Sequence, residues 1–256
     1  MRIAKFAVAG EARFGVVDGP ELVVFKGHPL FSGYETTGER IALKDVQLLP
    51  PTLPTSKVVC VGKNYADHAA EMGGEAPKEP LIFFKPNTAL VGDGEPIVLP
   101  AISNQVDHEV ELAVVIGDIA RKVAAADADK YIWGYTIAND VTARDLQAKD
   151  GQWARAKGFD TFCPLGPWIE TEFEVDNQAI QSRVDGDLRQ HAELNDMIHS
   201  VGRIIEHITQ FMTLFPGDIV LTGTPAGIGP LVAGDSITCS IEGIGELTNP
   251  VVADSL

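Results

Sequence analysis

The stretch that most constrains the fold is residues 106–116, where two glutamates lead into a long apolar run. Alternating and then continuous apolar residues predict a β-strand that enters a buried sheet. Because strand side chains alternate between faces, Glu109 and Glu111 point the same way, and the apolar residues around them face a core. Two adjacent carboxylates resist burial, so they need a shared proton, a basic partner or a divalent cation. Carboxylate oxygens favour Mg²⁺ or Mn²⁺, and the alternative is a solvated strand end with both glutamates exposed.

The composition is that of a globular protein with one large domain, or a main domain and a small appendage. Of its 256 residues, 45% are hydrophobic and 22% are charged, and the formal net charge is −16. This acidity argues against nucleic acid and anionic membrane as partners, and an anionic substrate needs local basic residues. No apolar run is long enough to span a bilayer, and residues 1–9 lack a secretory hydrophobic region, so we expect a cytoplasmic protein. Cys60, Cys163 and Cys239 are far apart, which indicates reduced, buried thiols.

Two regions follow from the distribution of turns. Residues 1–50 form short alternating segments between turn clusters, which predicts a small β-rich N-terminal domain. A proline-rich connector at 49–56 separates it from a main body over residues 57–256.

The second half of the main body carries two predicted hairpins and one helix. The hairpins cover 180–191, with a turn at Asp185-Gly186, and 236–252. Apolar residues at helical spacing predict an amphipathic helix over 197–212. His199 and His207 are interpreted as helix residues without a function.

A histidine and a glutamate share one face of a predicted helix over 65–72, with Asn64 as its N-cap. His68 and Glu71 are three residues apart, so they are able to hydrogen-bond, and a carboxylate-held histidine is a plausible general base for water. The glycines that follow suit a mobile lid. The alternative is an exposed pair on a surface helix.

Further polar residues follow predicted strands. Asp140 ends a strand over 131–139, and Thr142 is predicted to cap a helix on which Arg144 and Gln147 share a face. For Arg144 the alternative role is an ion pair with a nearby acid such as Asp140.

Two other residues are candidates for contact with an anion. Lys85 ends the strand 81–84, where it either faces the substrate or extends to solvent. The glycine-rich loop 222–229 lacks the phosphate-loop pattern, but its backbone donors and Thr224 would be able to cradle a carboxylate.

These features combine into one hypothesis. Glu109, Glu111 and Asp140 would form a three-carboxylate metal site, completed by water or substrate. Such a site keeps a net negative charge, so an anionic substrate would need nearby cations, for which the sequence offers Lys85, Arg144 and Lys157.

Six motifs in order resemble the fumarylacetoacetate hydrolase family from Lys57 to the end of the chain, about four-fifths of its length. The N-terminal region resembles that of bacterial members less specifically. The motifs are GKNYADHAAE (62–71), FFKPNT (83–88), DHEVEL (107–112), NDVTARDLQ (139–147), AKGFDTFCP (156–164) and TGTPAGIG (222–229).

The resemblance implies an α+β fold, a mixed β-roll with flanking helices, that forms a homodimer. It implies Mg²⁺ or Mn²⁺ on Glu109, Glu111 and Asp140, and makes His68 and Glu71 a water-activating pair on a lid. Lys157 would stabilise an enolate. The residues expected to orient the substrate are Lys85, Arg144, Gln147 and Thr224.

The reaction implied by the resemblance is metal-dependent hydrolysis of a C–C bond in an acylpyruvate-like 2,4-dioxo acid, with a pyruvate enolate as the leaving group. The rival on the same site is an oxaloacetate decarboxylase or a 2-hydroxyhepta-2,4-diene-1,7-dioate isomerase. A different class, a non-catalytic module that binds metal or an organic acid, would have lost the His68–Glu71 pair or Lys157, and the sequence has both.

Overall fold

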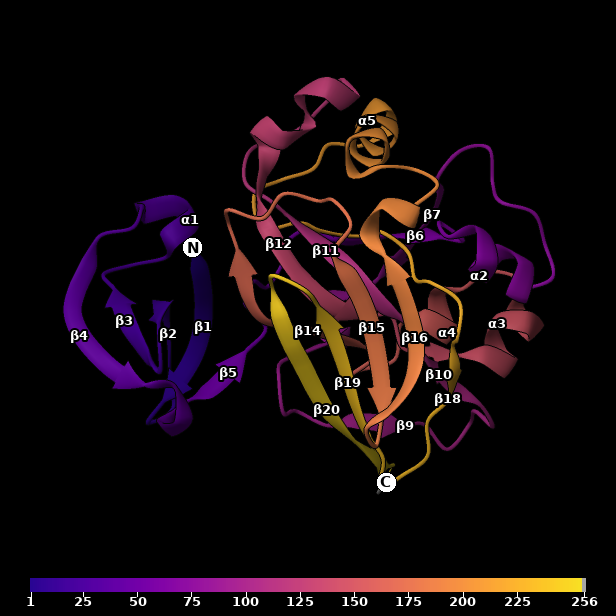
Figure 1. The fold of residues 1–256 in the computed structure, drawn as a ribbon, viewed down its shortest axis with the longest axis horizontal. Helices are drawn as coiled ribbons and strands as arrows, with labels where there is room; N and C mark the ends of the chain where they lie inside the picture. The colour runs from indigo at the N-terminus through magenta and orange to yellow at the C-terminus, as the bar shows by residue number, and fades with distance from the viewer. Residues whose placement is uncertain (255–256) are drawn as a thin grey trace.

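A computed structural model describes residues 1–254 of the chain. Figure 1 shows the N-terminal strands, in indigo, at one side of the molecule and helices α2, α3 and α4 at the other. The α+β class predicted from the sequence is confirmed, with 19% helix and 43% strand. No helix in the described part of the chain is long and apolar enough to cross a membrane.

The N-terminal region is β-rich and contains more elements than the sequence pattern shows. Its 3-10 helix is η1 (Leu43–Asp45) and its short α-helix is α1 (Pro29–Ser32). The polar, exposed strand β4 was not predicted, because it has no alternating apolar pattern. The strands are β1 (Arg2–Val8), β2 (Glu11–Asp18), β3 (Glu21–Phe25), β4 (Thr36–Ala42) and β5 (Gln47–Leu49).

One twelve-stranded sheet runs through both regions in the order β4-β3-β2-β1-β14-β12-β11-β17-β6-β7. The strand β1 pairs antiparallel with β14, while β5 pairs with β1 and β8 with β14, so the N-terminal strands extend the main sheet. Its strands in the main body are β6 (Val58–Gly62), β7 (Leu81–Lys85), β8 (Leu90–Val91), β11 (Val110–Ile116), β12 (Ile132–Asn139), β14 (Cys163–Glu170) and β17 (Ile219–Leu221).

Two smaller sheets complete the main body. A five-stranded sheet has the order β16-β15-β19-β20-β9, and a three-stranded sheet has the order β13-β10-β18. Both predicted hairpins are confirmed, as β15–β16 and β19–β20. The strands are β9 (Ile97–Leu99), β10 (Val106–His108), β13 (Thr142–Ala143), β15 (Ala179–Val184), β16 (Asp187–Glu193), β18 (Gly229–Pro230), β19 (Ser236–Ile241) and β20 (Gly245–Ala253).

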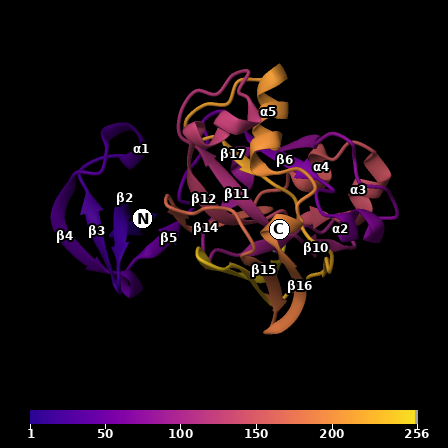
Figure 2. The same cartoon turned by 45° about the horizontal axis from the view of Figure 1, so that its top comes forward.

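The helices lie at the ends and edges of the sheets, and α5 covers one end in both views (Figures 1 and 2). The polar segment 151–157 contains α4, a short helix that no helical spacing in the sequence indicates. The α-helices are α2 (Ala66–Glu71), α3 (Arg144–Asp150), α4 (Ala154–Lys157) and α5 (Val201–Phe211). The 3-10 helices of the main body are η2 (Asn87–Ala89), η3 (Ala125–Tyr131) and η4 (Leu194–Asp196).

The predicted amphipathic helix is confirmed but begins four residues later than expected. Ser200 caps it by accepting a hydrogen bond from the Arg203 amide, so His199 precedes the helix. The His199 amide donates to the Asn64 side chain, and its ring lies 3.1 Å from the Pro77 carbonyl oxygen. The placement of His199 on the helix was therefore wrong.

Two predicted helix caps are also wrong. The Asn64 amide donates to the Thr222 and His199 carbonyls, so it fastens the start of α2 to the loop after β17. The Thr142 hydroxyl donates to the Asp140 carbonyl rather than accepting from the following helix. Both residues are buried, and their side chains bond outside the following helix, Thr142 also to Glu109 at 3.3 Å.

The main core lies between the large sheet, the five-stranded sheet and α5. Every residue of β11 is buried, which confirms the strand predicted from the apolar run. Val110, Leu112 and Val114 contribute to this core together with Ile204 and Ile208 of α5. The acidic end of this strand is therefore held in a rigid, close-packed frame.

Candidate metal centre

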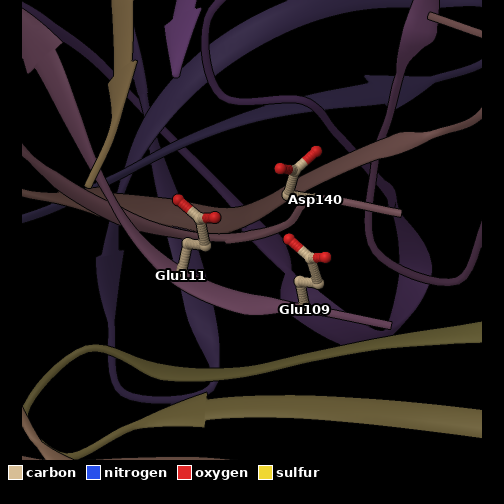
Figure 3. Close-up of side chains that lie close together, drawn as sticks. All are labelled: Glu109, Glu111 and Asp140. Carbon is tan, nitrogen blue, oxygen red and sulfur yellow. The ribbon is translucent and has the colours of Figure 1, made fainter. Parts of the chain in front are cut away.

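The three predicted carboxylates lie where two neighbouring strands leave the large sheet. Glu109 separates β10 from β11, and Asp140 separates β12 from β13. At these two residues the polypeptide passes between the large sheet and the three-stranded sheet. The Asp140 amide donates to the Glu109 carbonyl at 2.8 Å, which fixes the two residues side by side. Glu111 follows on β11, and the three side chains converge (Figure 3).

One carboxylate oxygen from each residue lies within 4.8 Å of the others. Glu109, Glu111 and Asp140 are 3%, 1% and 0% exposed, so the alternative of a solvated strand end is wrong.

Two cations neutralise part of this cluster. The Lys157 ammonium donates to Glu109 Oε2 at 2.9 Å and to Asp140 Oδ2 at 2.5 Å. Arg144 binds the other oxygen of Glu109 and donates to Asp107 at 2.8 Å. Burial opposes ionisation of Glu109, but Lys157 and Arg144 outweigh it and hold its pKa well below the ordinary value. Burial opposes the charge of Lys157, but the carboxylates of Asp140 and Glu109 outweigh burial and raise the pKa of its amine.

Glu111 is the carboxylate of the cluster to which neither Lys157 nor Arg144 donates a hydrogen bond. Burial, followed by the charges of Asp140 and Glu109, raises its pKa well above the ordinary value. The Gly223 amide donates to Glu111 at 2.7 Å. Glu111 therefore favours a proton, or a bound cation in its place, over standing as a third bare carboxylate in the cluster.

Lys85 forms an ion pair with Asp140 but does not line the cavity that Asp140 lines. Its ammonium donates to the carbonyls of Val141, Lys157 and Phe162 at 2.6–3.0 Å, which uses its three N–H bonds. It also lies 2.7 Å from Asp140 Oδ1, but no N–H is directed at that oxygen, which is buried without a hydrogen-bond donor. Lys85 thus supplies charge to Asp140 while leaving an oxygen lone pair available.

These features fit a hard divalent cation. Three buried carboxylates offer only oxygen ligands, and Asp140 keeps a free lone pair. Neither Lys157 nor Arg144 donates to Glu111. Glu109, Glu111 and Asp140 are the residues that would hold it.

His68 and Glu71 lie beside this cluster on α2. The His68 Nδ1 atom is 3.1 Å from Glu71 Oε2, and the Gly227 amide donates to the other Glu71 oxygen at 3.1 Å. His68 is 5% exposed, so the alternative of an exposed surface pair does not apply to it. The glycine-rich loop therefore holds Glu71, which in turn orients the histidine.

Eight of the ten predicted site residues line one cavity, and the exceptions are Glu71 and Lys85. The cavity measures about 30 Å³, which is room for about two water molecules. A substrate therefore enters only if α2 or the side chains around the cavity move. Arg144 also donates to Gln147 at 2.6 Å, as their helical spacing predicted. Its predicted alternative partner, Asp140, is replaced by Asp107 and Glu109.

Thr224 is held by a residue that the sequence did not reveal. Its hydroxyl donates to the Val110 carbonyl at 2.8 Å and accepts from Gln190 at 2.7 Å. Gln190 also donates to the Pro225 carbonyl and accepts from the Val110 amide. Gln190 is fully buried on β16 between exposed neighbours, and because it is polar like them, no signal in the sequence pointed to it.

Comparisons with known proteins identify the class that this fold and cluster define. The family model described as "Fumarylacetoacetate (FAA) hydrolase C-terminal" matches residues 57–252, and one described as "Rv2993c-like, N-terminal" matches residues 1–51. The chain belongs to the fumarylacetoacetate hydrolase family, and the mixed β-roll expected from the resemblance is confirmed.

Among its relatives, "Protein Rv2993c" of Mycobacterium tuberculosis is 52% identical over 262 residues, covering 98% of each chain. "Oxaloacetate tautomerase FAHD2B, mitochondrial" of Bos taurus is 46% identical and covers 81% of this chain and 70% of its own.

Two solved structures bear on the chemistry. A 5-carboxymethyl-2-hydroxymuconate delta-isomerase from Mycobacterium smegmatis is 48% identical, with a TM-score of 0.92 and 99% and 100% coverage of this chain and its own. A maleylpyruvate hydrolase from Sphingobium sp. SYK-6, solved with manganese(II) and pyruvate, is 31% identical, with a TM-score of 0.84 and full coverage of both chains.

Proposed function

We propose that this protein is a Mg²⁺- or Mn²⁺-dependent hydrolase that cleaves the C3–C4 bond of acylpyruvate-like 2,4-dioxo acids. The observation that carries this proposal is that two groups of residues meet at one cavity. A buried cluster of three carboxylates lines it together with a buried histidine that a fourth carboxylate orients.

A cation held by Glu109, Glu111 and Asp140 would supply Lewis-acid polarisation of the 2-oxo group. His68 takes a proton from water, and Glu71 stabilises the imidazolium that results. The water attacks the 4-carbonyl, and the electrons of the C3–C4 bond pass to the pyruvate fragment. The Lys157 ammonium, already directed at this cluster, faces the negative charge that develops there.

Arg144 and Gln147 line the same cavity from α3, and we assign them the orientation of the substrate carboxylate. Thr224 lines the same cavity, and two hydrogen bonds fix the orientation of its hydroxyl. For Lys85 we now propose a positioning role, because its three N–H bonds are used by backbone carbonyls and it does not line the cavity.

The second candidate is tautomerisation, isomerisation or decarboxylation of a 2-oxo acid on the same site. Its support is similarity: the relatives named tautomerase and isomerase are 46% and 48% identical, against 31% for the named hydrolase. All these reactions pass a proton to or from an enol form of the substrate. Only the hydrolysis adds the elements of water.

Isotopic water separates the candidates. We expect turnover of acetylpyruvate with Mg²⁺ in H₂¹⁸O to place one ¹⁸O in the released acetate, measured by mass spectrometry. His68→Ala should lower this rate at least about 100-fold, since a general base contributes about that much. The control His207→Ala alters a histidine on α5 that packs against Phe211, and should leave the rate unchanged. Rapid conversion of oxaloacetate without any cleavage of acetylpyruvate would favour the second candidate.

We also propose a homodimer, as the resemblance implied, and a cytoplasmic location, as expected from the sequence. The three cysteines are buried and free, which is compatible with a reducing compartment. Light scattering of the purified protein would test the dimer.

A further inference from the structure

The basic residues that line the cavity differ in their partners. Arg144 and Lys157 are each paired with the acidic residues of the cluster. Lys63, the third, forms no hydrogen bond or ion pair with any residue of the described chain, 1–254. In a protein with 36 acidic and 20 basic residues, a half-buried lysine without an acidic partner is unexpected.

The backbone at Lys63 is nevertheless held firmly. Its φ is +57°, a left-handed conformation that costs energy for a residue with a side chain. The side chain of the next residue, Asn64, makes three hydrogen bonds, to the Thr222 carbonyl and to the carbonyl and amide of His199. The chain is thus locked in the conformation that brings the Lys63 side chain to the cavity wall.

The surroundings of Lys63 differ from those of the carboxylate cluster. Its ammonium lies beside the glycine turn that ends α2, because a Cβ atom built on Gly74 would be 3.1 Å from Nζ. The same cavity is also lined by Met72, Phe83 and Trp153, and the last two rings meet edge to face at 5.2 Å. The cavity therefore combines a cation-binding cluster, an apolar lining and an unpaired ammonium.

We propose that Lys63 determines substrate specificity by binding a second carboxylate at the distal end of the substrate. The inference rests on the proposed function, in which the 2-oxo acid end of the substrate binds at Glu109, Glu111 and Asp140. The apolar lining accommodates the carbon chain, and the Lys63 ammonium pairs with the terminal carboxylate. Chains that end in a carboxylate are then preferred over chains of equal length that end in a methyl group.

Binding measurements test this role without requiring turnover. With Mg²⁺ present, calorimetry compares 2-oxoadipate with 2-oxohexanoate, which differ only in a terminal carboxylate or methyl group. Wild-type protein should prefer 2-oxoadipate. Lys63→Met should weaken 2-oxoadipate about tenfold or more, as expected for a hydrogen bond to a charged group, and change 2-oxohexanoate less than twofold. Lys63→Arg should restore most of the preference.

Steady-state kinetics provide a second test, with 2,4-dioxoheptanedioate and 2,4-dioxoheptanoate as matched substrates. Lys63→Met should raise KM for the dioate and leave kcat and the monocarboxylate unchanged. The control Lys78→Met removes an exposed lysine from the loop after α2, outside the cavity, and should have no effect.

Three outcomes would overturn the role of Lys63. The wild type would bind both ligands equally, or Lys63→Met would weaken the binding of both ligands equally, or Lys63→Met would not weaken the binding of 2-oxoadipate. If the binding preference depends on Lys63 but neither dioxo acid is hydrolysed, the proposed hydrolase function fails and the specificity role stands. If both dioxo acids are hydrolysed and neither rate depends on Lys63, the hydrolase function stands and the specificity role fails.

Discussion

Gln190 connects three parts of the molecule through one buried side chain. It lies on β16 of the five-stranded sheet, accepts from the Val110 amide on β11 and from the Ser182 hydroxyl, and donates to Thr224 and Pro225. The metal-ligand strand and the cavity wall are therefore fixed to each other by the second sheet. Loss of this amide would leave several buried polar groups unpaired.

We expect Gln190→Leu to lower the free energy of unfolding by about 2–4 kcal/mol, because at least two buried partners lose their hydrogen bonds. Urea denaturation measures this change. The adjacent Arg189→Leu alters a half-exposed side chain and should change stability by less than about 0.5 kcal/mol. Equal stability of both variants would contradict the role given to Gln190.

At the level of residues, the placement of the charged side chains was easier to predict from the sequence than their hydrogen-bond partners. Glu109 and Glu111 were predictable because a strand's alternation places both on one face of an apolar segment. The distances from Asp140 and Lys157 to Glu109 depend on where two strands leave a sheet, which no local pattern encodes. Gln190 reaches the site from about 80 residues away in the chain, so its role was visible only in the structure.

Among the elements, β1 joins the N-terminal region to the main body. It pairs with β14 at Arg2–Glu170 and Ile3–Ile169, and Ile3 and Phe25 pack on Trp133 and Val115 in one small core. Although the family models divide the chain near residue 51, this core is shared between the two regions.

Removal of residues 1–51 should therefore lower the melting temperature of the remaining chain, because β14 loses a pairing strand and its apolar neighbours become exposed. Differential scanning calorimetry measures the effect. Substituting Ile3→Ala in the full-length chain should act in the same direction, by about 2–5 kcal/mol for a fully buried isoleucine. A truncated chain as stable as the full-length protein would show that the regions are independent.

Strands and hairpins were more predictable than helix ends. The long apolar strand β12 begins within one residue of the start that its apolar pattern predicts and ends where predicted. The cap predictions at Asn64 and Thr142 failed because each side chain found a partner in another segment. The short α4 was missed, since four residues contain no helical period, although it carries Lys157.

For the molecule as a whole, the three buried thiols connect stability with pH. Burial is the main cause that raises the pKa of Cys60 and Cys239 well above the ordinary value and that of Cys163 to about 12. In the unfolded chain these thiols ionise near pH 8.5. Above that pH the unfolded state binds fewer protons than the folded state, so the free energy of unfolding falls as pH rises.

We expect a loss of about 1.4 kcal/mol per pH unit for each thiol between about pH 8.5 and pH 10, in the presence of a reductant. Cys239→Ala should remove about one third of the slope contributed by the three thiols, whatever its effect on stability at neutral pH. Denaturation curves at several pH values measure the slope, and an unchanged slope in Cys239→Ala would contradict the assignment.

The account depends most on the three-carboxylate cluster, which two strands bring together at the junction of two sheets. Glu111 is the most informative member, because neither Lys157 nor Arg144 donates to it. Exchanging its carboxylate for an amide removes a ligand charge and preserves the shape of the side chain.

The most direct measurement is a calorimetric titration of metal-free protein with Mn²⁺. The account predicts one site per chain in the wild type, an affinity at least about tenfold weaker in Glu111→Gln, and no change in the exposed control Glu174→Gln. Equal Mn²⁺ affinity of wild type and Glu111→Gln, or turnover that persists unchanged after chelation of divalent metal, would contradict it.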